Sequence, residues 1–231
     1  MSVRDFTASE IANVKQRYPG LSGSSFQIIE GALDMHAQYE AEMISGIYNI
    51  KITSANPQSN RIPALYEIGG KTEAIADKYQ IIDLRTLHKN IDGTACLCAR
   101  PMERDFFPGD FNLLMYIEKL VVPYLFSLTF YEKYQRWPWG DYNHGLLGIL
   151  EFYGENKPIL SPEEIFEVRP SFLNDPIRSL CYKQIKRPSA KRSCLCGSTK
   201  RFKDCHQQAW YGAKHLSIEL TRLGISPDHL F

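Results

Sequence analysis

The chain has 231 residues, of which 44% are hydrophobic and 23% are charged, and its formal net charge is +1 at pH 7. This composition predicts a soluble globular protein with one ordinary domain and a small appendage, and it excludes an overall attraction to nucleic acid or membranes. No basic-then-apolar leader opens the chain, and no apolar run reaches the roughly 18 residues of a membrane span. We therefore expect a cytoplasmic protein whose six cysteines are reduced, catalytic or metal-bound.

The first part of the sequence predicts a helix followed by strands. A helix is expected over residues 7–18, because Thr7 is a good N-cap and Glu10 follows three residues later. Alternating or continuous apolar residues predict strands at 26–33, 45–52 and 62–68.

A cysteine then follows two groups that can assist it chemically. The stretch contains His88, Asn90, Gly93 and Cys96 in close succession. An ionised thiol is a strong nucleophile, an Asn amide can donate to an oxyanion, and a His can order the loop or carry protons. The segment is therefore a candidate acyl-transfer site. The alternative is that Cys96 is a small apolar residue in a turn.

The His-x-Asn element followed by Gly-x-x-Cys-Leu resembles the active-site segment of E2 ubiquitin-conjugating enzymes. The resemblance implies that Cys96 carries a ubiquitin-like protein as a thioester, and that Asn90 stabilises the oxyanion during attack by an amine. Lys89 stands where the family usually has Pro, and the gap from Asn90 to Cys96 is shorter than usual. Both departures are typical of the divergent bacterial E2-like branch.

The strongest helix signal covers residues 111–136, where apolar residues recur every three or four positions and Pro123 is expected to kink or interrupt the helix. The loop after it contains Asp141 and His144. In E2 proteins a polar residue at this place receives the proton of the amine, so the resemblance makes Asp141 and His144 candidates for that role. The alternative is a packed loop that caps the core.

Helices are also predicted at 146–153, from Ser161 onwards and at 207–223. Between the last two, prolines at 170, 176 and 188 predict an irregular linker. Eight Lys or Arg residues lie between Lys183 and Lys203. Such a run is usually a solvated face; contact with nucleic acid or an acidic partner is the alternative.

Near the C-terminus, Cys194, Cys196, Cys205 and His206 supply the four ligands that a tetrahedral zinc ion prefers. No open ligand position is implied, so a structural zinc site is expected. A short basic segment of this kind buries too little apolar area to order itself without a metal. The pattern resembles the SEC-C motif, a zinc hairpin found in many unrelated proteins.

The predicted fold class is α+β: an E2-like conjugating domain at 1–158, a Pro-punctuated linker and helix at 159–190, and a zinc knuckle with its helix at 191–231. The resemblance to E2-like components of CBASS anti-phage systems implies a protein partner that supplies a C-terminal acyl group, namely a cGAS-like nucleotidyltransferase. Activation of that C-terminus is expected to come from another protein, and neither membrane nor nucleic acid is expected as a partner.

Three alternatives to this transferase remain. The chain can be a non-catalytic E2-like module that holds a partner with its zinc end. It can also be a cysteine hydrolase in which His88 or His144 activates Cys96. Finally, Cys96 and Cys98 can form a redox pair, although no thioredoxin-like pattern surrounds them. Cys181 is expected to be a buried small residue.

Overall fold

The computed structural model describes residues 5–40, 42–57, 59, 61–107 and 111–231. The chain forms two compact units, which are described separately below. The first comprises Met1–Cys98 and Met102–Gly140, and the second comprises Ala99–Pro101 and Asp141–Phe231. A four-stranded antiparallel sheet and many helices confirm the predicted α+β class.

The first unit begins with helix α1, Ala8–Arg17, where Thr7 and Glu10 form the expected capping box. The other carboxylate oxygen of Glu10 accepts a hydrogen bond from the backbone N–H of Leu113 at 3.3 Å. A single buried side chain therefore satisfies backbone donors of two helices that are far apart in the sequence. The predicted helix at 7–18 is confirmed.

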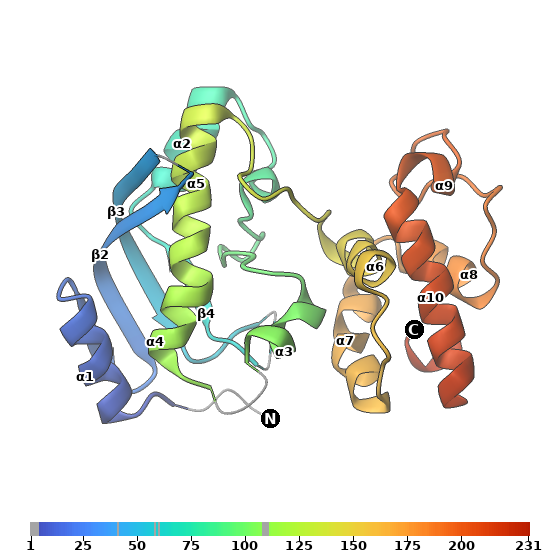
Figure 1. The fold of residues 1–231 in the computed structure, drawn as a ribbon, viewed down its shortest axis with the longest axis horizontal. Helices are drawn as coiled ribbons and strands as arrows, with labels where there is room; N and C mark the ends of the chain where they lie inside the picture. Colours follow the sequence, from blue (N-terminus) through green and yellow to red (C-terminus); the bar gives the residue numbers. More distant parts are fainter. Residues whose placement is uncertain (1–4, 41, 58, 60, 108–110) are drawn as a thin grey trace. The chain divides into compact units, whose positions relative to one another are not determined.

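The sheet is a meander with the order β1-β2-β3-β4 (Figure 1). Its strands are Leu21–Ser25, Ile28–Tyr39, Glu42–Thr53 and Ala64–Glu67. The last three overlap the strands predicted at 26–33, 45–52 and 62–68, and β1 is an additional strand. Leu33 of β2 lies opposite Tyr48 of β3, and both side chains are buried. The two long strands thus present one apolar face to the core.

A long helical segment covers this apolar face (Figure 1). It consists of α4, Leu113–Tyr116, a π-helical segment, Ile117–Val121, and α5, Val122–Tyr134. Pro123 lacks a backbone N–H, and directly before it the Val122 N–H donates to the Ile117 carbonyl, five residues earlier. The predicted interruption is therefore confirmed.

The same segment, Leu113–Tyr134, is the one described helix that is long and apolar enough to cross a membrane. Most of it is buried within the protein, as in the core helix of a soluble protein. The cytoplasmic location stays a prediction.

The first unit also contains α2, Lys71–Tyr79, the 3₁₀ turn η1, Leu84–Leu87, and α3, Glu103–Phe106. The turn η2, Arg100–Met102, precedes α3 in the sequence.

The second unit is helical. Its elements are α6, Gly145–Asn156; α7, Pro162–Asn174; α8, Arg178–Lys186; α9, Phe202–Cys205; α10, Gln207–Leu223; and the turn η4, Pro227–His229. The helices predicted at 146–153, from Ser161 and at 207–223 are confirmed. The prediction of an irregular linker is wrong in part, because Pro170 lies inside α7 and a further helix, α8, follows Pro176.

Helices α6 and α10 pack against each other through two glycines. A Cβ atom added to Gly212 would lie 1.7 Å from the Leu150 carbonyl oxygen, and one added to Gly154 would lie 2.0 Å from the Gln208 oxygen. Only residues without a side chain allow the two backbones to approach this closely. This contact places α6 in the second unit, so the boundary between the units follows Gly140 rather than residue 158.

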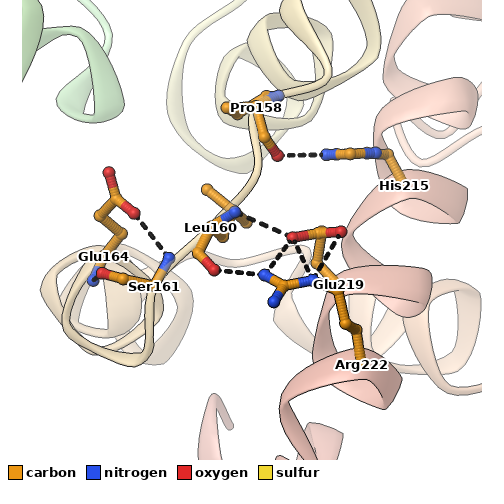
Figure 2. Close-up of polar contacts among 7 residues, drawn as sticks. All are labelled: Pro158, Leu160, Ser161, Glu164, His215, Glu219 and Arg222. Carbon is orange, nitrogen blue, oxygen red and sulfur yellow. Dashed lines mark hydrogen bonds and ion pairs between the residues drawn. The ribbon is translucent and has the colours of Figure 1, made fainter.

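Polar side chains of α10 form hydrogen bonds with the backbone of the segment between α6 and α7 (Figure 2). Glu219 accepts a hydrogen bond from the Leu160 N–H at 2.8 Å, and Arg222 bonds both Glu219 and the Leu160 carbonyl. The His215 ring donates to the Pro158 carbonyl at 2.8 Å. Arg222 lowers the pKa of the Glu219 carboxyl, so this carboxylate stays ionised and bound at neutral pH.

The close contact at Gly212 predicts whether a Gly to Ala substitution raises or lowers the stability of the protein. In an unpacked helix, Gly to Ala stabilises by about 1 kcal/mol, because Ala is the better helix former. In the close contact, Gly212→Ala should instead destabilise by about 1–3 kcal/mol, because the methyl group meets backbone atoms of α6. Thermal unfolding measures the change. Thr221→Ala, on an exposed position of α10, is the control and should change stability by about 0.5 kcal/mol or less. A stabilised Gly212→Ala variant would show that α6 and α10 do not pack in this way.

Candidate active site and candidate metal centre

Cys96 ends a short hairpin in the first unit. Its N–H donates to the His88 carbonyl at 2.7 Å, and the Asn90 N–H donates to the Thr94 carbonyl at 2.8 Å. Gly93 has φ +83° at the tip, in the left-handed region that a residue without Cβ adopts freely. The backbone thus folds back on itself, and it brings the beginning and the end of the segment 88–96 together.

Two further contacts fix the hairpin to the rest of the unit. The Ala95 N–H donates to the carbonyl of Leu65, in strand β4, at 2.8 Å. Lys89, which forms an antiparallel bridge with Ala95, makes an ion pair with Glu73 of α2. The Lys89 side chain is only 14% exposed, so the pair is better shielded from water than a surface pair. The sheet and α2 therefore both position the candidate nucleophile.

His88 and Cys96 lie side by side. A ring nitrogen of His88 lies within 4.8 Å of the Cys96 sulfur. His88 has the left-handed φ of +54°, and its ring packs edge-on against Trp137 with 4.5 Å between ring centroids. The unusual backbone angle and the aromatic contact together fix the direction of the imidazole. At a separation of up to 4.8 Å, one water molecule can carry a proton between the two side chains.

Asn90 is held by a chain of hydrogen bonds within the hairpin. Its side-chain nitrogen donates to the Thr94 hydroxyl at 2.9 Å, and this hydroxyl donates to the Asp92 carboxylate at 2.6 Å. The Asn90 amide is therefore held within the hairpin that carries Cys96. One of its two N–H groups is used in the bond to Thr94.

The two neighbouring cysteines differ chemically. Both residues are half-buried by exposed area, and the difference concerns their thiol groups. Burial raises the pKa of the Cys98 thiol well above its ordinary value, and the nearby Glu103 carboxylate adds to the effect. Cys98 is therefore held in the unreactive thiol form at neutral pH, which leaves Cys96 as the candidate nucleophile. Cys181 is fully buried, as expected, and burial raises the pKa of its thiol too.

Asp141 and His144 lie at the beginning of the longer segment of the second unit, Asp141–Phe231. His144 is the N-terminal cap residue of α6, and it makes no capping hydrogen bond with its side chain. The role of either residue as proton acceptor at Cys96 stays a prediction.

A second cluster lies within the second unit. The sulfur atoms of Cys194, Cys196 and Cys205 and a ring nitrogen of His206 all lie within 4.8 Å of one another. These are the four residues expected to bind a metal. The cluster can accept a metal ion, because its thiolates and imidazole are the ligands that soft and borderline metals prefer.

A small hairpin and a helix end bring the four ligands together. The Cys194 N–H donates to the Lys200 carbonyl at 2.9 Å, and the Phe202 N–H donates to the Arg192 carbonyl at 2.9 Å. Gly197, with φ +83°, lies in the turn after the first two cysteines. Cys205 ends α9, and His206 follows before α10 begins. The first ligand pair thus comes from a turn and the second from a junction between helices.

The distances within the cluster fit a tetrahedral ion. With metal–sulfur bonds near 2.3 Å, two sulfur ligands lie about 3.8 Å apart and a sulfur and a nitrogen ligand about 3.5 Å apart. The Cys196 and Cys205 sulfurs are 3.7 Å apart. Cys194 Sγ and His206 Nδ1 are 3.0 Å apart, so this pair opens by about 0.5 Å when a metal enters. Nδ1 is the His206 atom that faces the other ligands.

Ser198 supports two of the cysteines. Hydrogen bonds from its hydroxyl and its backbone N–H lower the pKa of Cys196 to about 6. The hydroxyl also lies 3.3 Å from the Cys205 sulfur. Burial has the opposite effect on Cys194 and raises its pKa to about 12. Without metal, one thiolate therefore forms readily at neutral pH, and the others release their protons on metal binding.

Sequence reasoning did not identify several residues that hold the candidate active site. Glu73 contacts Lys89, Thr94 contacts Asn90, and Trp137 contacts His88. Asp92 accepts a hydrogen bond from Thr94. The Asp-Gly-Thr sequence at the tip is a turn signal that could have indicated the bond between Asp92 and Thr94. No local signal indicates Glu73 or Trp137, because they are distant in the sequence.

The cluster predicts one bound divalent metal ion per chain, measured as metal content after dialysis. Cys205→Ser removes one of four ligands, and it should lower the affinity by more than the about 10–100-fold typical of a residue that only supports a ligand. Cys96→Ser is the matched control and should keep full metal content, because Cys96 is not part of the cluster. Equal metal content in both variants would contradict this ligand set.

No protein-family model, curated protein or solved structure matches this chain. The functional reading of the two clusters consequently depends on their own residues and geometry. For Cys96, that geometry is a positioned thiol beside an imidazole on a fixed hairpin. For the second unit, it is four ligand atoms around one point.

Proposed function

We propose that the first unit is an E2-like cysteine transferase, which carries the C-terminal acyl group of a partner protein as a thioester on Cys96 and passes it to an amine. The observation that carries this proposal is the hairpin that holds the Cys96 sulfur within 4.8 Å of a His88 ring nitrogen. The Asn90 amide on the same hairpin is the proposed oxyanion donor.

The order of elements supports the proposal. An N-terminal helix, a four-stranded antiparallel meander, a cysteine loop and a long apolar helix follow one another, as in the E2 enzymes that the Cys96 segment resembles. One departure is helix α2, which stands between β4 and the hairpin. It supplies Glu73, which forms the ion pair with Lys89. We propose that this pair restrains the hairpin where the family usually has a rigid proline.

The proposed reaction has two steps. In the first, the Cys96 thiolate attacks the activated C-terminal carbonyl carbon of the partner, a C–S bond forms, and the activating group departs with its bonding electrons. In the second, an amine attacks the thioester, a C–N bond forms, and Cys96 departs as a thiolate. His88 receives the proton of the amine directly or through water. The negative charge that develops on the carbonyl oxygen in each step is stabilised by the Asn90 amide.

The same resemblance gives the proposed setting. The acyl donor is a cGAS-like nucleotidyltransferase, its C-terminus is activated by a separate enzyme, and the reaction takes part in anti-phage defence in the cytoplasm. We further propose that the metal of the second unit is structural zinc in a SEC-C-like module. Three sulfurs and one imidazole nitrogen fill a tetrahedral shell, which leaves no position for substrate.

One observation favours the alternative of a non-catalytic module. The Asn90 side chain already donates to Thr94, so its first role can be to close the hairpin. In a scaffold of this kind Cys96 would be a packed residue, and the zinc end would hold the partner. The two functions differ in whether Cys96 accepts an acyl group.

The nucleophile is tested with a peptide thioester as acyl donor. Mixed with the full chain, it should form an adduct on Cys96 that survives denaturation and is released by hydroxylamine. Cys96→Ala should abolish the adduct, whereas Cys98→Ala should keep it, because the raised pKa of Cys98 holds that sulfur as a thiol. Mass spectrometry of the intact chain measures both. Loss in Cys98→Ala with retention in Cys96→Ala would move the site, and no adduct in the native chain would favour the scaffold.

The role of Asn90 is tested on the preformed thioester. Asn90→Ala should slow transfer to a free amine by about 10²-fold, the typical effect of losing one oxyanion donor. Thr94→Val, which removes the orienting hydroxyl, should slow transfer as well, and Thr94→Ser should restore it. Single-turnover rates are compared with thermal stability for each variant. Unchanged transfer in Asn90→Ala would show that Asn90 only closes the hairpin.

A further inference from the structure

The second unit carries eight Lys or Arg residues between positions 183 and 203. Lys183 and Arg187 lie at the end of α8 and directly after it, and the hairpin that leads to the candidate metal ligands follows in the sequence. Arg192 joins the two parts, because one guanidinium nitrogen donates to the Arg187 carbonyl at 2.8 Å and to the Lys183 carbonyl. The basic hairpin is therefore tied to the end of α8.

Carboxylates neutralise only a small part of this charge. Eight cations lie between Lys183 and Lys203. Arg201 pairs with Asp204 at 2.5 Å, and Lys186 lies 3.7 Å from Asp228. The remaining side chains form no ion pair within the described part of the chain, and most of them are exposed. These exposed cations without a carboxylate are Lys183, Arg187, Lys191 and Lys200.

The same surface offers no apolar contact. Leu195 and Phe202, the large apolar residues of the hairpin, are buried beneath it. The large apolar side chains that are exposed in the second unit lie outside the range 183–206. Protein interfaces need an apolar core, and their cores are depleted of lysine. A surface that binds a phosphate backbone needs exposed cations instead, because the affinity comes from neutralised phosphates and not from buried apolar area.

We propose that this surface, formed by the end of α8 and the hairpin at 191–203, binds nucleic acid through its phosphate backbone without reading the base sequence. The sequence alone favours a solvated face for the basic run. The fold favours a binding surface instead, because it ties the hairpin to the end of α8 and leaves six of the eight cations without a carboxylate in the described part of the chain. The proposal is independent of the transferase function, since none of these residues belongs to the first unit.

The experiment uses the metal-loaded full chain and a fluorescently labelled 24-base-pair DNA duplex, with a labelled 24-nucleotide RNA in parallel. Anisotropy should give a Kd in the range of about 10⁻⁴–10⁻⁶ M for non-specific binding at physiological salt. The affinity should be the same for unrelated sequences and fall steeply with salt. Lys191→Gln combined with Lys200→Gln should make the slope of log K against log salt shallower by about 1.8, or about 0.9 for each lost phosphate contact.

The matched control is Lys15→Gln combined with Lys119→Gln, which removes the same charge from exposed positions of the first unit. It should leave both the affinity and the slope unchanged, as should Cys96→Ala. An equal loss in both lysine pairs, or no binding by the native chain, would overturn the proposal. Polyglutamate of matched charge serves as the competitor. If it bound as tightly as the nucleic acid, the surface would be a site for acidic proteins and the proposal would be wrong.

Discussion

The position of the candidate nucleophile depends on one hydrogen bond, between the Ala95 N–H and the Leu65 carbonyl. Strand β4 is the last strand of the sheet, so its outer edge offers backbone groups that no further strand uses. The Leu65 carbonyl is one of these groups, and it accepts the hydrogen bond from the Cys96 hairpin. Because Leu65 also pairs with Ile52 of β3, the hairpin is tied to the register of the central strands. The loop that carries the candidate nucleophile is thereby attached to the sheet.

This attachment explains why ionic and aromatic contacts matter around the hairpin. A hairpin of this length has no core of its own, and an isolated hairpin is marginally stable in water. The Lys89–Glu73 pair and the His88–Trp137 contact each join the hairpin to a helix or loop of the same unit. Their geometry fixes side-chain directions as well as the backbone. A site that must place an imidazole beside a sulfur benefits from both effects.

The elements predicted from sequence are those whose signals are local. The capping boxes at Thr7 and Ser161 and the turn at Gly224 mark helix ends through neighbouring residues, and the structure has helices there. Strand β1 was missed because four of its five residues are exposed, so no apolar alternation marks it. The prediction of an irregular linker at 159–190 was wrong in part for a related reason. Proline restrains only its own turn, and tertiary packing of α7 and α8 decided the rest.

The two candidate sites also differ in how far local sequence signals predict them. The metal ligands could be found from sequence because all four lie within 13 residues, from Cys194 to His206, and their spacing alone brings them together. The candidate active site was only partly predictable. The pairing of His88 with Cys96 follows from a short hairpin, but the Glu73 and Trp137 contacts depend on how distant segments pack. Sequence reasoning therefore identified the reactive groups and missed the residues that orient them.

The metal cluster also accounts for the high density of charge near the C-terminus. Uncompensated cations on a small hairpin repel one another, and this repulsion opposes the compact state. In the knuckle, Leu195 and Phe202 supply a very small core, and metal coordination by the four ligands would add folding free energy. This stability does not require the surface to carry apolar groups or counter-charges. The chain can therefore present exposed cations there, which is the property that a phosphate-binding surface needs.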